Sequence, residues 1–426
     1  MSRVYNEQQY LQELEKRGRL PKGFRAGATS LAFTPGERPT QEPYKMNISC
    51  ILCDRPTESF AGVFTKNAFP GAPVIIGKEK VHRDSVQGIV VNNRIANVST
   101  ATGVQDALAL TRAVGETMEM DPEGIFPVST GIIGWKLPIP EMLGALGSLK
   151  SSLQNQQVLP VAQAIMTTDS FPKVRSVPLG EGTLVGIAKG AGMIEPNMAT
   201  MLVFLLTDVG FHRNQGQESL QRVVDRTFNA ISVDGDQSTS DMCLLLGSQH
   251  LPQVSQQELE TALSQVCQEL AEDIVRNGEG TSHVIAVRVR GRATNEEARS
   301  LGKAVINSPL VKTAIYGNDP NVGRILSSLG DYLGNNGLAS DLGLLDITIG
   351  EHQVLSKGVF TLSKEKELAL SEYFSDSSMN PRIKGYPQHQ KSVEILVDFH
   401  QGPGEARVLG SDLTHEYVHE NADYRS

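Results

Sequence analysis

Several features are scarce in this chain of 426 residues. Cysteine occurs only four times, too seldom for a disulfide-stabilised scaffold, which favours a reducing compartment. Aromatic residues make up 5%, the net charge is −9 and no long basic run occurs, so nucleic acid is not an expected partner. No apolar run approaches the roughly 20 residues that a membrane-spanning helix needs. The N-terminal segment has no apolar core typical of a secretory signal, and we expect a cytoplasmic protein.

The few cysteines do not complete a metal site. Cys50 and Cys53 have the spacing of half a zinc site, but Cys243 and Cys267 are isolated in the sequence. No second pair of cysteines and no close pair of histidines supplies the missing ligands. We therefore expect buried, apolar cysteines and no metal.

Glycine is abundant, with 40 residues, and apolar residues make up 39% of the chain. This composition favours an α/β protein, and the length favours about two or three subdomains. The apolar patterns predict helices and strands by their period. Expected helices are 107–118, 158–166, 256–277 and 295–305; expected strands are 60–67, 70–76, 183–188, 201–206, 284–289, 314–316 and 393–399.

The segment 189–209, KGAGMIEPNMATMLVFLLTDV, combines a lysine, a glycine-rich turn and a buried strand. Thr200 stands directly before the expected strand, where a hydroxyl group can face a cleft. No histidine base is evident near Thr200 in the sequence. A known alternative base is the α-amine of the threonine itself, freed by cleavage of the preceding bond. Its pKa of roughly 7.7–8.0 would let it accept a proton near neutral pH.

Two further loops have patterns that chemistry uses. Ser129, Thr130 and Gly131 follow a short apolar run, and backbone N–H groups at such a bend often bind an anion or an oxyanion. An ordinary glycine turn is the alternative, and the local pattern alone favours it. The acidic segment 234–241 lacks the spacing of a calcium loop, so we expect turn and capping roles there.

Longer motifs resemble one family over nearly the whole chain after about residue 20. They occur in the order typical of the ornithine acetyltransferase family, also called bifunctional glutamate N-acetyltransferase. The matching segments are GFRAG (23–27), AGVFTKN (61–67), STGIIG (129–134), MTTDSFPK (166–173), KGAGMIEPNMATML (189–202), VDGDQSTSD (233–241), NGEG (277–280), SPLVKTAIYGNDPNVGR (308–324) and EYVHENADYRS at the C-terminus.

The resemblance implies a self-processing acyltransferase of arginine biosynthesis. The bond between Ala199 and Thr200 would be cleaved, giving an α chain (1–199) with the oxyanion segment and a β chain (200–426), assembled as an α2β2 heterotetramer. Thr200 would take the acetyl group from N2-acetylornithine and pass it to glutamate in a ping-pong reaction. Acetyl-CoA is a possible co-substrate, and no cofactor is implied. The implied fold is α/β, with mixed sheets layered against helices, similar to self-processing hydrolases related to the DmpA aminopeptidase.

The resemblance also implies roles for individual residues. Thr130 and Gly131 match the oxyanion pair. In the segment 166–173 a threonine binds substrate, and we favour Thr168 over Thr167. Lys189 would face the carboxylate of an amino-acid substrate and Glu279 an ammonium group. The expected substrate-binding residues are Thr168, Lys189, Thr200, Glu279, Asn421 and Ser426.

Other interpretations stay open. Taken singly, Lys189 would be a solvated lysine, Glu279 a turn cap, and the C-terminal residues a frayed tail. The chain also departs from the family pattern at Arg94, Ile95, Gln237, Ser240 and Val322, where glycine, a polar residue, threonine, asparagine and tryptophan are usual. The alternatives are a self-processing amide hydrolase or aminopeptidase, an acyltransferase with a shifted substrate, and a binding protein that processes poorly.

Overall fold

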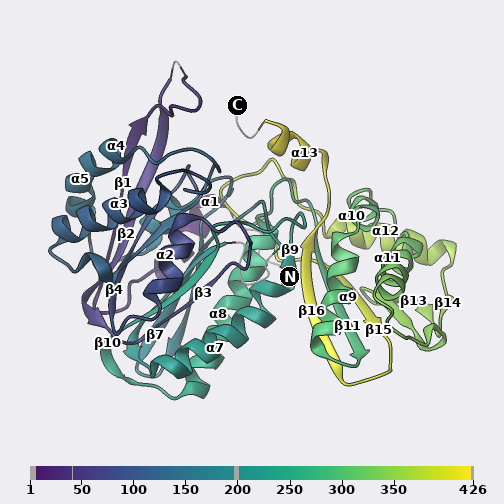
Figure 1. Ribbon diagram of the computed structural model, residues 1–426. Coiled ribbons are helices and arrows are strands. Elements are labelled where there is room, and N and C mark those ends of the chain that lie inside the picture. Colours follow the sequence, from purple (N-terminus) through teal and green to yellow (C-terminus); the bar gives the residue numbers. More distant parts are fainter. Residues whose placement is uncertain (1–5, 41, 196–200, 424–426) are drawn as a thin grey trace.

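The apolar segments assemble into sheets covered by helices in the computed structural model, which describes residues 6–40, 42–195 and 201–423. In this part of the chain the strands form three sheets. Figure 1 shows the N-terminal and middle segments gathered on one side and the C-terminal segments on the other. The fold class predicted from the sequence, α/β with mixed sheets layered against helices, is confirmed.

The first sheet has the strand order β1-β2-β4-β5. Its first three strands are antiparallel, whereas β4 and β5 run parallel and place Asn92 opposite Ser129. The segments after these two residues therefore leave the sheet side by side, and the second one contains Thr130 and Gly131. The strands are β1 (Phe24–Phe33), β2 (Tyr44–Thr57), β4 (Val86–Asn92) and β5 (Ile125–Ser129).

The second sheet has the order β3-β10-β8-β7-β6. The parallel pair β8 and β10 lies at its centre, and β8 is buried along its whole length, as expected of a strand covered on both faces. Leu202 is opposite Met242 on one side and Lys189 on the other, so these three residues lie at one end of the sheet. The strands are β3 (Phe60–Phe64), β6 (Lys173–Leu179), β7 (Gly182–Lys189), β8 (Leu202–Gly210) and β10 (Met242–Gln253).

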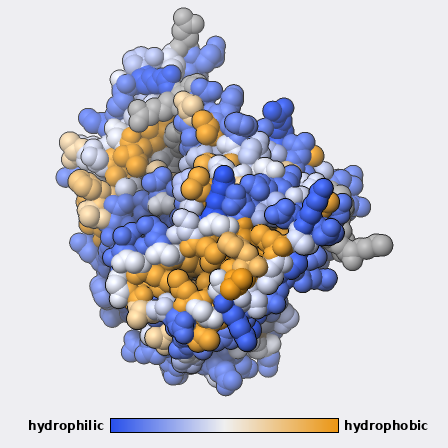
Figure 2. All heavy atoms as spheres, turned by 90° about the vertical axis from the view of Figure 1, so that its right-hand side faces the viewer, coloured by the Kyte–Doolittle hydropathy of each residue, from blue (hydrophilic) through white to orange (hydrophobic). Residues whose placement is uncertain are grey.

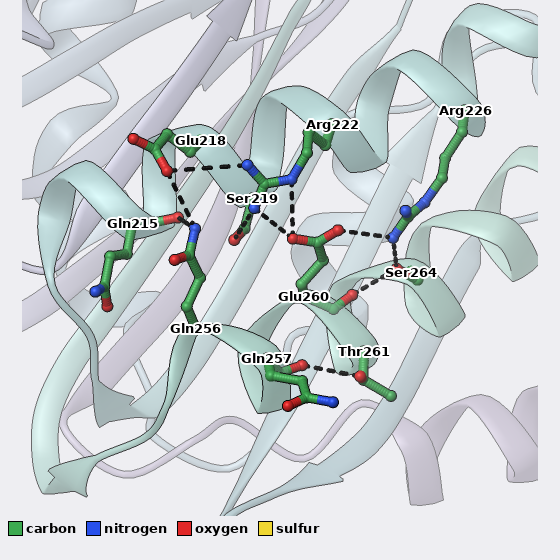
Figure 3. A network of polar contacts seen from close by, with 10 residues as sticks. All are labelled: Gln215, Glu218, Ser219, Arg222, Arg226, Gln256, Gln257, Glu260, Thr261 and Ser264. Atoms are coloured by element: carbon green, nitrogen blue, oxygen red, sulfur yellow. Dashed lines mark hydrogen bonds and ion pairs between the residues drawn. The ribbon is translucent and has the colours of Figure 1, made fainter. Parts of the chain in front are cut away.

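These two sheets are the inner layers of a helix–sheet–sheet–helix stack. One apolar core joins the facing sides of the two sheets, for example Phe126 and Phe204. The outer side of the first sheet packs on helices α3 (Gly103–Met118), α4 (Ile139–Gly144) and α5 (Leu146–Ser152). The outer side of the second packs on α7 (Arg213–Arg226) and α8 (Gln256–Arg276). Figure 3 shows the polar contacts between α7 and α8, in which Glu260 binds both Arg222 and Arg226.

The third sheet, with the order β14-β13-β12-β15-β11-β16-β9, forms a separate core with C-terminal helices. Its strands are β9 (Ile231–Ser232), β11 (Val284–Arg292), β12 (Asp346–Ile349), β13 (His352–Ser356), β14 (Val359–Phe360), β15 (Val393–Asp398) and β16 (Gly404–Ser411). The helices packed on it are α9 (Asn295–Asn307), α10 (Pro309–Tyr316), α11 (Val322–Asn335) and α12 (Lys364–Asp376). The remaining helices are α1 (Glu7–Arg17), α2 (Ala72–Lys80), α6 (Leu159–Ala164) and α13 (His415–Ala422).

Two strands predicted from the sequence are wrong. The segment 70–76 enters α2, which begins after Gly71 with Pro73 in its first turn. The segment 314–316 is the end of α10, in which the Ser308 hydroxyl accepts a hydrogen bond from the Val311 amide. In both cases β-branched residues suggest a strand, but proline in the first turn starts a helix and tertiary packing outweighs propensity.

The cysteines are buried and free of disulfides, as the sequence predicts. Cys50 belongs to the core under α3–α5, whereas Cys53 belongs to the core between the sheets. Because they lie on opposite faces of β2, their thiols cannot bind one ion together. Burial raises the pKa of Cys50 to about 12, which makes this thiol unreactive. No helix in the described ranges has both the length and the apolarity to cross a membrane.

Candidate active site

A pocket of about 280 Å³ lies where the two facing sheets meet the segment after α8 and the C-terminal end of α13. Its size suits a small molecule. Six of the residues predicted from the sequence line it: Thr130, Gly131, Thr168, Lys189, Glu279 and Asn421. Met201, the residue after the predicted nucleophile, lines it too. Ala199, Thr200 and Ser426 lie outside the described residues, as does the boundary between the predicted α and β chains, so the cleavage site and the roles of these residues stay predictions.

Thr130 and Gly131 are held against the segment after β4. The Thr130 amide donates to the Asn92 carbonyl at 3.1 Å, and the Ile132 amide donates to the Arg94 carbonyl at 2.9 Å. Gly131 has a φ of 128°, and a Cβ atom there would lie 2.2 Å from the Arg94 carbonyl carbon. Only glycine fits this position.

This geometry sharpens the prediction of an oxyanion cradle. Since the Thr130 amide is already bonded, the donor that Thr130 can offer is its side-chain hydroxyl. Within the described ranges, the amide of Gly131 and the hydroxyl of Thr130 have no hydrogen-bond partner. One side-chain O–H and one backbone N–H are therefore available together at the pocket wall, rather than two backbone N–H groups.

Asn92 supports this wall. Its buried side chain donates to the Ile95 carbonyl at 2.9 Å and accepts from the Ser129 hydroxyl at 2.7 Å. The amide group thereby joins the ends of β4 and β5, a role that the sequence pattern of a polar turn does not reveal. Arg94 has a φ of 70° at the position where the family usually has glycine, so the backbone keeps the left-handed conformation despite the side chain.

Glu279 is fixed in the pocket by several partners. Asn421 donates to its Oε2 atom at 2.8 Å, and the Thr168 hydroxyl also bonds to the carboxyl group. The Glu279 amide donates to the Ala191 carbonyl at 2.9 Å, and a Cβ atom on Gly192 would lie 2.2 Å from Oε2. Burial raises the pKa of Glu279, and the bonds from Thr168 and Asn421 oppose that rise.

A buried ion pair under the pocket was not predicted from the sequence. Asp169 and Lys173 have fully buried side chains and are 2.6 Å apart. Asp169 also accepts from the amides of Gly190 at 2.8 Å and Thr167 at 3.1 Å. Burial alone would raise the pKa of Asp169, but the charges of Lys173 and Lys189 and these bonds lower it to about 2. The ionised carboxylate thus ties together the segments that carry Thr168 and Lys189.

Asp234 holds the loop on the other side of Lys189. Its carboxylate accepts from the amides of Met193 at 2.7 Å and Ile194 at 2.8 Å. The Tyr417 hydroxyl of α13 donates to it at 3.4 Å. Turn and capping roles predicted for the acidic segment 234–241 are confirmed for this residue. The loop that it fixes leads into the segment with the predicted cleavage site.

Two charged groups of the pocket are less well matched. Lys189 ends β7, and its ammonium group has no ion-pair partner within 4.0 Å in the part of the chain that the structure describes. Asp241 directly precedes β10, and its Oδ2 atom is buried and finds no hydrogen-bond partner in the described ranges. Of the departures from the family pattern, Ser240 lines the pocket, whereas Val322 lies in the core of the third sheet.

Stacked sheets and a pair of unengaged donors beside a small-molecule pocket are the arrangement expected of one class, α/β enzymes that act on acyl groups. Comparison with known proteins then identifies the family, because the ArgJ family model matches residues 36–426. An arginine biosynthesis bifunctional protein ArgJ 2 from Clostridium acetobutylicum is 37% identical over 95% of this chain and 98% of its own. The protein of the same kind from Dehalococcoides mccartyi is 37% identical over 95% and 96%.

The chain therefore belongs to the ArgJ family. This confirms the family and the enzyme class predicted from the motifs, an acyltransferase of arginine biosynthesis. Among solved structures, an arginine biosynthesis bifunctional protein from Bacillus halodurans aligns with a TM-score of 0.45 and 33% identity, over 52% of this chain and 98% of its own.

Proposed function

We propose that the enzyme moves an acetyl group from N2-acetylornithine to glutamate through an acetyl ester on Thr200, after cleavage of the bond between Ala199 and Thr200. The observation that carries this proposal is the convergence in one pocket of the Thr130 hydroxyl, the Gly131 amide and Lys189. Met201 lines the same pocket, which supports Thr200, its neighbour in the chain, as the nucleophile.

The chemistry needs few groups. The Thr200 hydroxyl attacks the acetyl carbonyl while the α-amine of Thr200 takes the hydroxyl proton. The carbonyl oxygen becomes an anion, which the Thr130 hydroxyl and the Gly131 amide stabilise by hydrogen bonds. The C–N bond breaks, ornithine leaves with the proton, and the acetyl ester remains. The amine of glutamate then attacks the ester by the same route, and Thr200 regains its proton.

The proposed binding groups match the charges of an amino acid. Lys189, which has no ion-pair partner within the described ranges, suits the substrate carboxylate. Glu279, Thr168 and Asn421 form one bonded group that suits an ammonium, and Ser426 is expected to complete the site. Acetyl-CoA is proposed as a second acetyl donor, without a bound cofactor.

We also propose a cytoplasmic α2β2 assembly. The free, buried cysteines fit a reducing compartment. An interface between copies is supported by an apolar area on the face of the third sheet's layer, which Figure 2 shows in orange. Exposed apolar side chains on the elements of this layer are Leu342, Leu344, Val359, Phe360 and Leu368.

Intact mass of the purified protein, beside a Thr200→Ala variant, tests the first step. We expect two fragments that meet between Ala199 and Thr200 in the wild type and one chain in the variant. Incubation with N2-acetylornithine should then label the fragment that begins at Thr200, and added glutamate should collect the acetyl group. Release of acetate without N-acetylglutamate would instead indicate a hydrolase, and a single chain of 46.2 kDa in both samples would contradict the proposal.

A further inference from the structure

The carboxyl group of Asp241 has no assigned role and an unusual environment. The residue is 3% exposed and lines the pocket. The Ser238 hydroxyl bonds to the carboxyl group, but the Oδ2 atom of Asp241 is buried and has no hydrogen-bond partner among the residues that the structure describes. A buried carboxyl oxygen that lacks a partner is costly, and most such atoms in folded proteins are bonded. The arrangement therefore calls for a ligand as the missing partner.

Main-chain hydrogen bonds explain where residue 241 lies, but they do not explain why its side chain is that of an aspartate. The Thr65 amide donates to the Asp241 carbonyl at 3.1 Å, and the next amide, of Met242, donates to the Met201 carbonyl at 3.1 Å. These bonds would form with any residue at 241. They also place Asp241 beside Met201, the neighbour of the proposed nucleophile in the chain.

The charges of the pocket match one kind of ligand. In the described part of its lining, the charged or titratable side chains are Lys189, Asp241 and Glu279. Ornithine carries one carboxylate and two amines. We propose that Asp241 is a second amine-binding carboxyl group of this pocket, which binds one amine of ornithine while Glu279 binds the other. The assignment rests on the proposed function and extends it.

The same two carboxyl groups can also accommodate the other substrate. Burial raises the pKa of Asp241 and of Glu279, and in each case the charge of Lys189 opposes the rise. In the free enzyme the Asp241 carboxyl thus tends to keep its proton. Binding of a cationic amine favours the ionised form and releases the proton. Glutamate brings two carboxylates, which protonated carboxyl groups can bind as donors. In this proposal one pocket binds a cationic amine when its carboxyl groups are ionised and a carboxylate when they are protonated.

Calorimetry of ornithine binding tests this assignment on the processed enzyme. Titrations in buffers of different ionisation enthalpy give the number of protons released, and repeating them at several pH values shows how that number depends on pH. For the wild type we expect proton release with ornithine and less with glutamate. Asp241→Asn should weaken ornithine binding by roughly ten- to a hundredfold and lose its share of the released protons.

A matched control keeps the result specific. Asp208→Asn replaces another buried aspartate, which accepts from the amides of Lys22 and Thr183 away from the pocket. This control should bind ornithine as the wild type does, and thermal melting checks that both variants are folded. Unchanged affinity and proton release in a folded Asp241→Asn variant would overturn the assignment while leaving acetyl transfer intact. If the wild type binds no ornithine, the proposed function fails, and this assignment with it.

Discussion

Two sets of polar groups lie in or next to the pocket, and they differ in how completely they are bonded. The anchored groups are the carboxylates of Asp169 and Asp234, each held by at least two hydrogen bonds. The open groups lack such partners within the described ranges. They are the Thr130 hydroxyl, the Gly131 amide, the Lys189 ammonium and Oδ2 of Asp241.

The difference separates structure from chemistry. Leaving a buried polar group without a hydrogen bond costs free energy. The anchored groups are satisfied within the protein and stabilise its fold, whereas the open groups can form their hydrogen bonds with a ligand. Changes to anchored groups should alter folding first. Changes to open groups should alter activity while the fold is kept.

Asp169→Ala should break an anchored ion pair whose two side chains are fully buried. The variant leaves Lys173 buried and unpaired, which costs about 3–5 kcal/mol of the free energy of unfolding. Urea unfolding measures this loss. A double variant with Lys173→Met should recover most of it, because no charge is then buried. A single variant as stable as the wild type would show that the pair does not anchor the site.

Thr130→Ala removes an open group. We expect kcat for acetyl transfer to fall by about 10²–10³, as for loss of one oxyanion donor, with the melting temperature unchanged. Thr130→Ser keeps the hydroxyl and should keep most of the activity. Thr183→Ala, on the opposite end of β7 from Lys189, is the control for a lost threonine. A fully active Thr130→Ala variant would remove Thr130 from the oxyanion pair.

Acid should reverse the anchoring by Asp169. Its pKa is lowered to about 2 in the folded protein, so its ionised form stabilises the fold. That stability is present above the unfolded pKa near 4 and is lost as the pH falls through about 2, amounting to about 2 kcal/mol. Unfolding measured between about pH 4 and pH 2 should be less pH-dependent in the Asp169→Asn, Lys173→Met double variant. Equal slopes for both proteins would contradict this attribution.

Arg94→Gly separates the backbone of the oxyanion wall from its side chain. Glycine relieves the left-handed conformation but makes the unfolded chain more flexible, so we expect a net gain of only about 0.5–1 kcal/mol. The Arg94 carbonyl still accepts from Ile132, and transfer activity should not change. Thermal melting and steady-state rates measure the two effects. A large loss of activity would assign the Arg94 side chain to the site.

Glu260→Gln measures how much an exposed ion pair far from the pocket contributes to stability. In Figure 3 Glu260 binds Arg222 and Arg226 on the surface of α7 and α8, with Arg222 at 2.6 Å. Such exposed pairs contribute less than about 1 kcal/mol and weaken in salt. Urea unfolding with and without added salt measures this contribution. A loss of stability as large as that from Asp169→Ala would contradict the expected difference between buried and exposed ion pairs.

Three of the four open groups could be identified from the sequence. Thr130, Gly131 and Lys189 stand in recognisable motifs, because ligand binding requires these residue types at these positions. The strand β8 was also evident, since an apolar run buried on both faces leaves a continuous pattern.

The anchored groups and Asp241 were harder to recognise. Asp169 and Lys173 are four residues apart, but their partners Asn277 and Gly190 come from the end of α8 and from the segment after β7. Asp241 stood inside an acidic segment, and only the folded chain distinguishes its unpaired oxygen from the capped carboxylate of Asp234. The segment 70–76 was misassigned for the same reason, because the neighbours that bury α2 are not local in sequence.

The strand order of the second sheet determines whether the two fragments can separate after the proposed cleavage. β3, β6 and β7 precede residue 199, whereas β8 and β10 follow residue 200, and the order β3-β10-β8-β7-β6 alternates between the two pieces. Main-chain hydrogen bonds would then cross two seams, β3–β10 and β7–β8. Separation of the two fragments would expose unpaired strand edges, which promote aggregation. Fragments produced in separate cells should therefore fail to dissolve, and only fragments made together should regain activity.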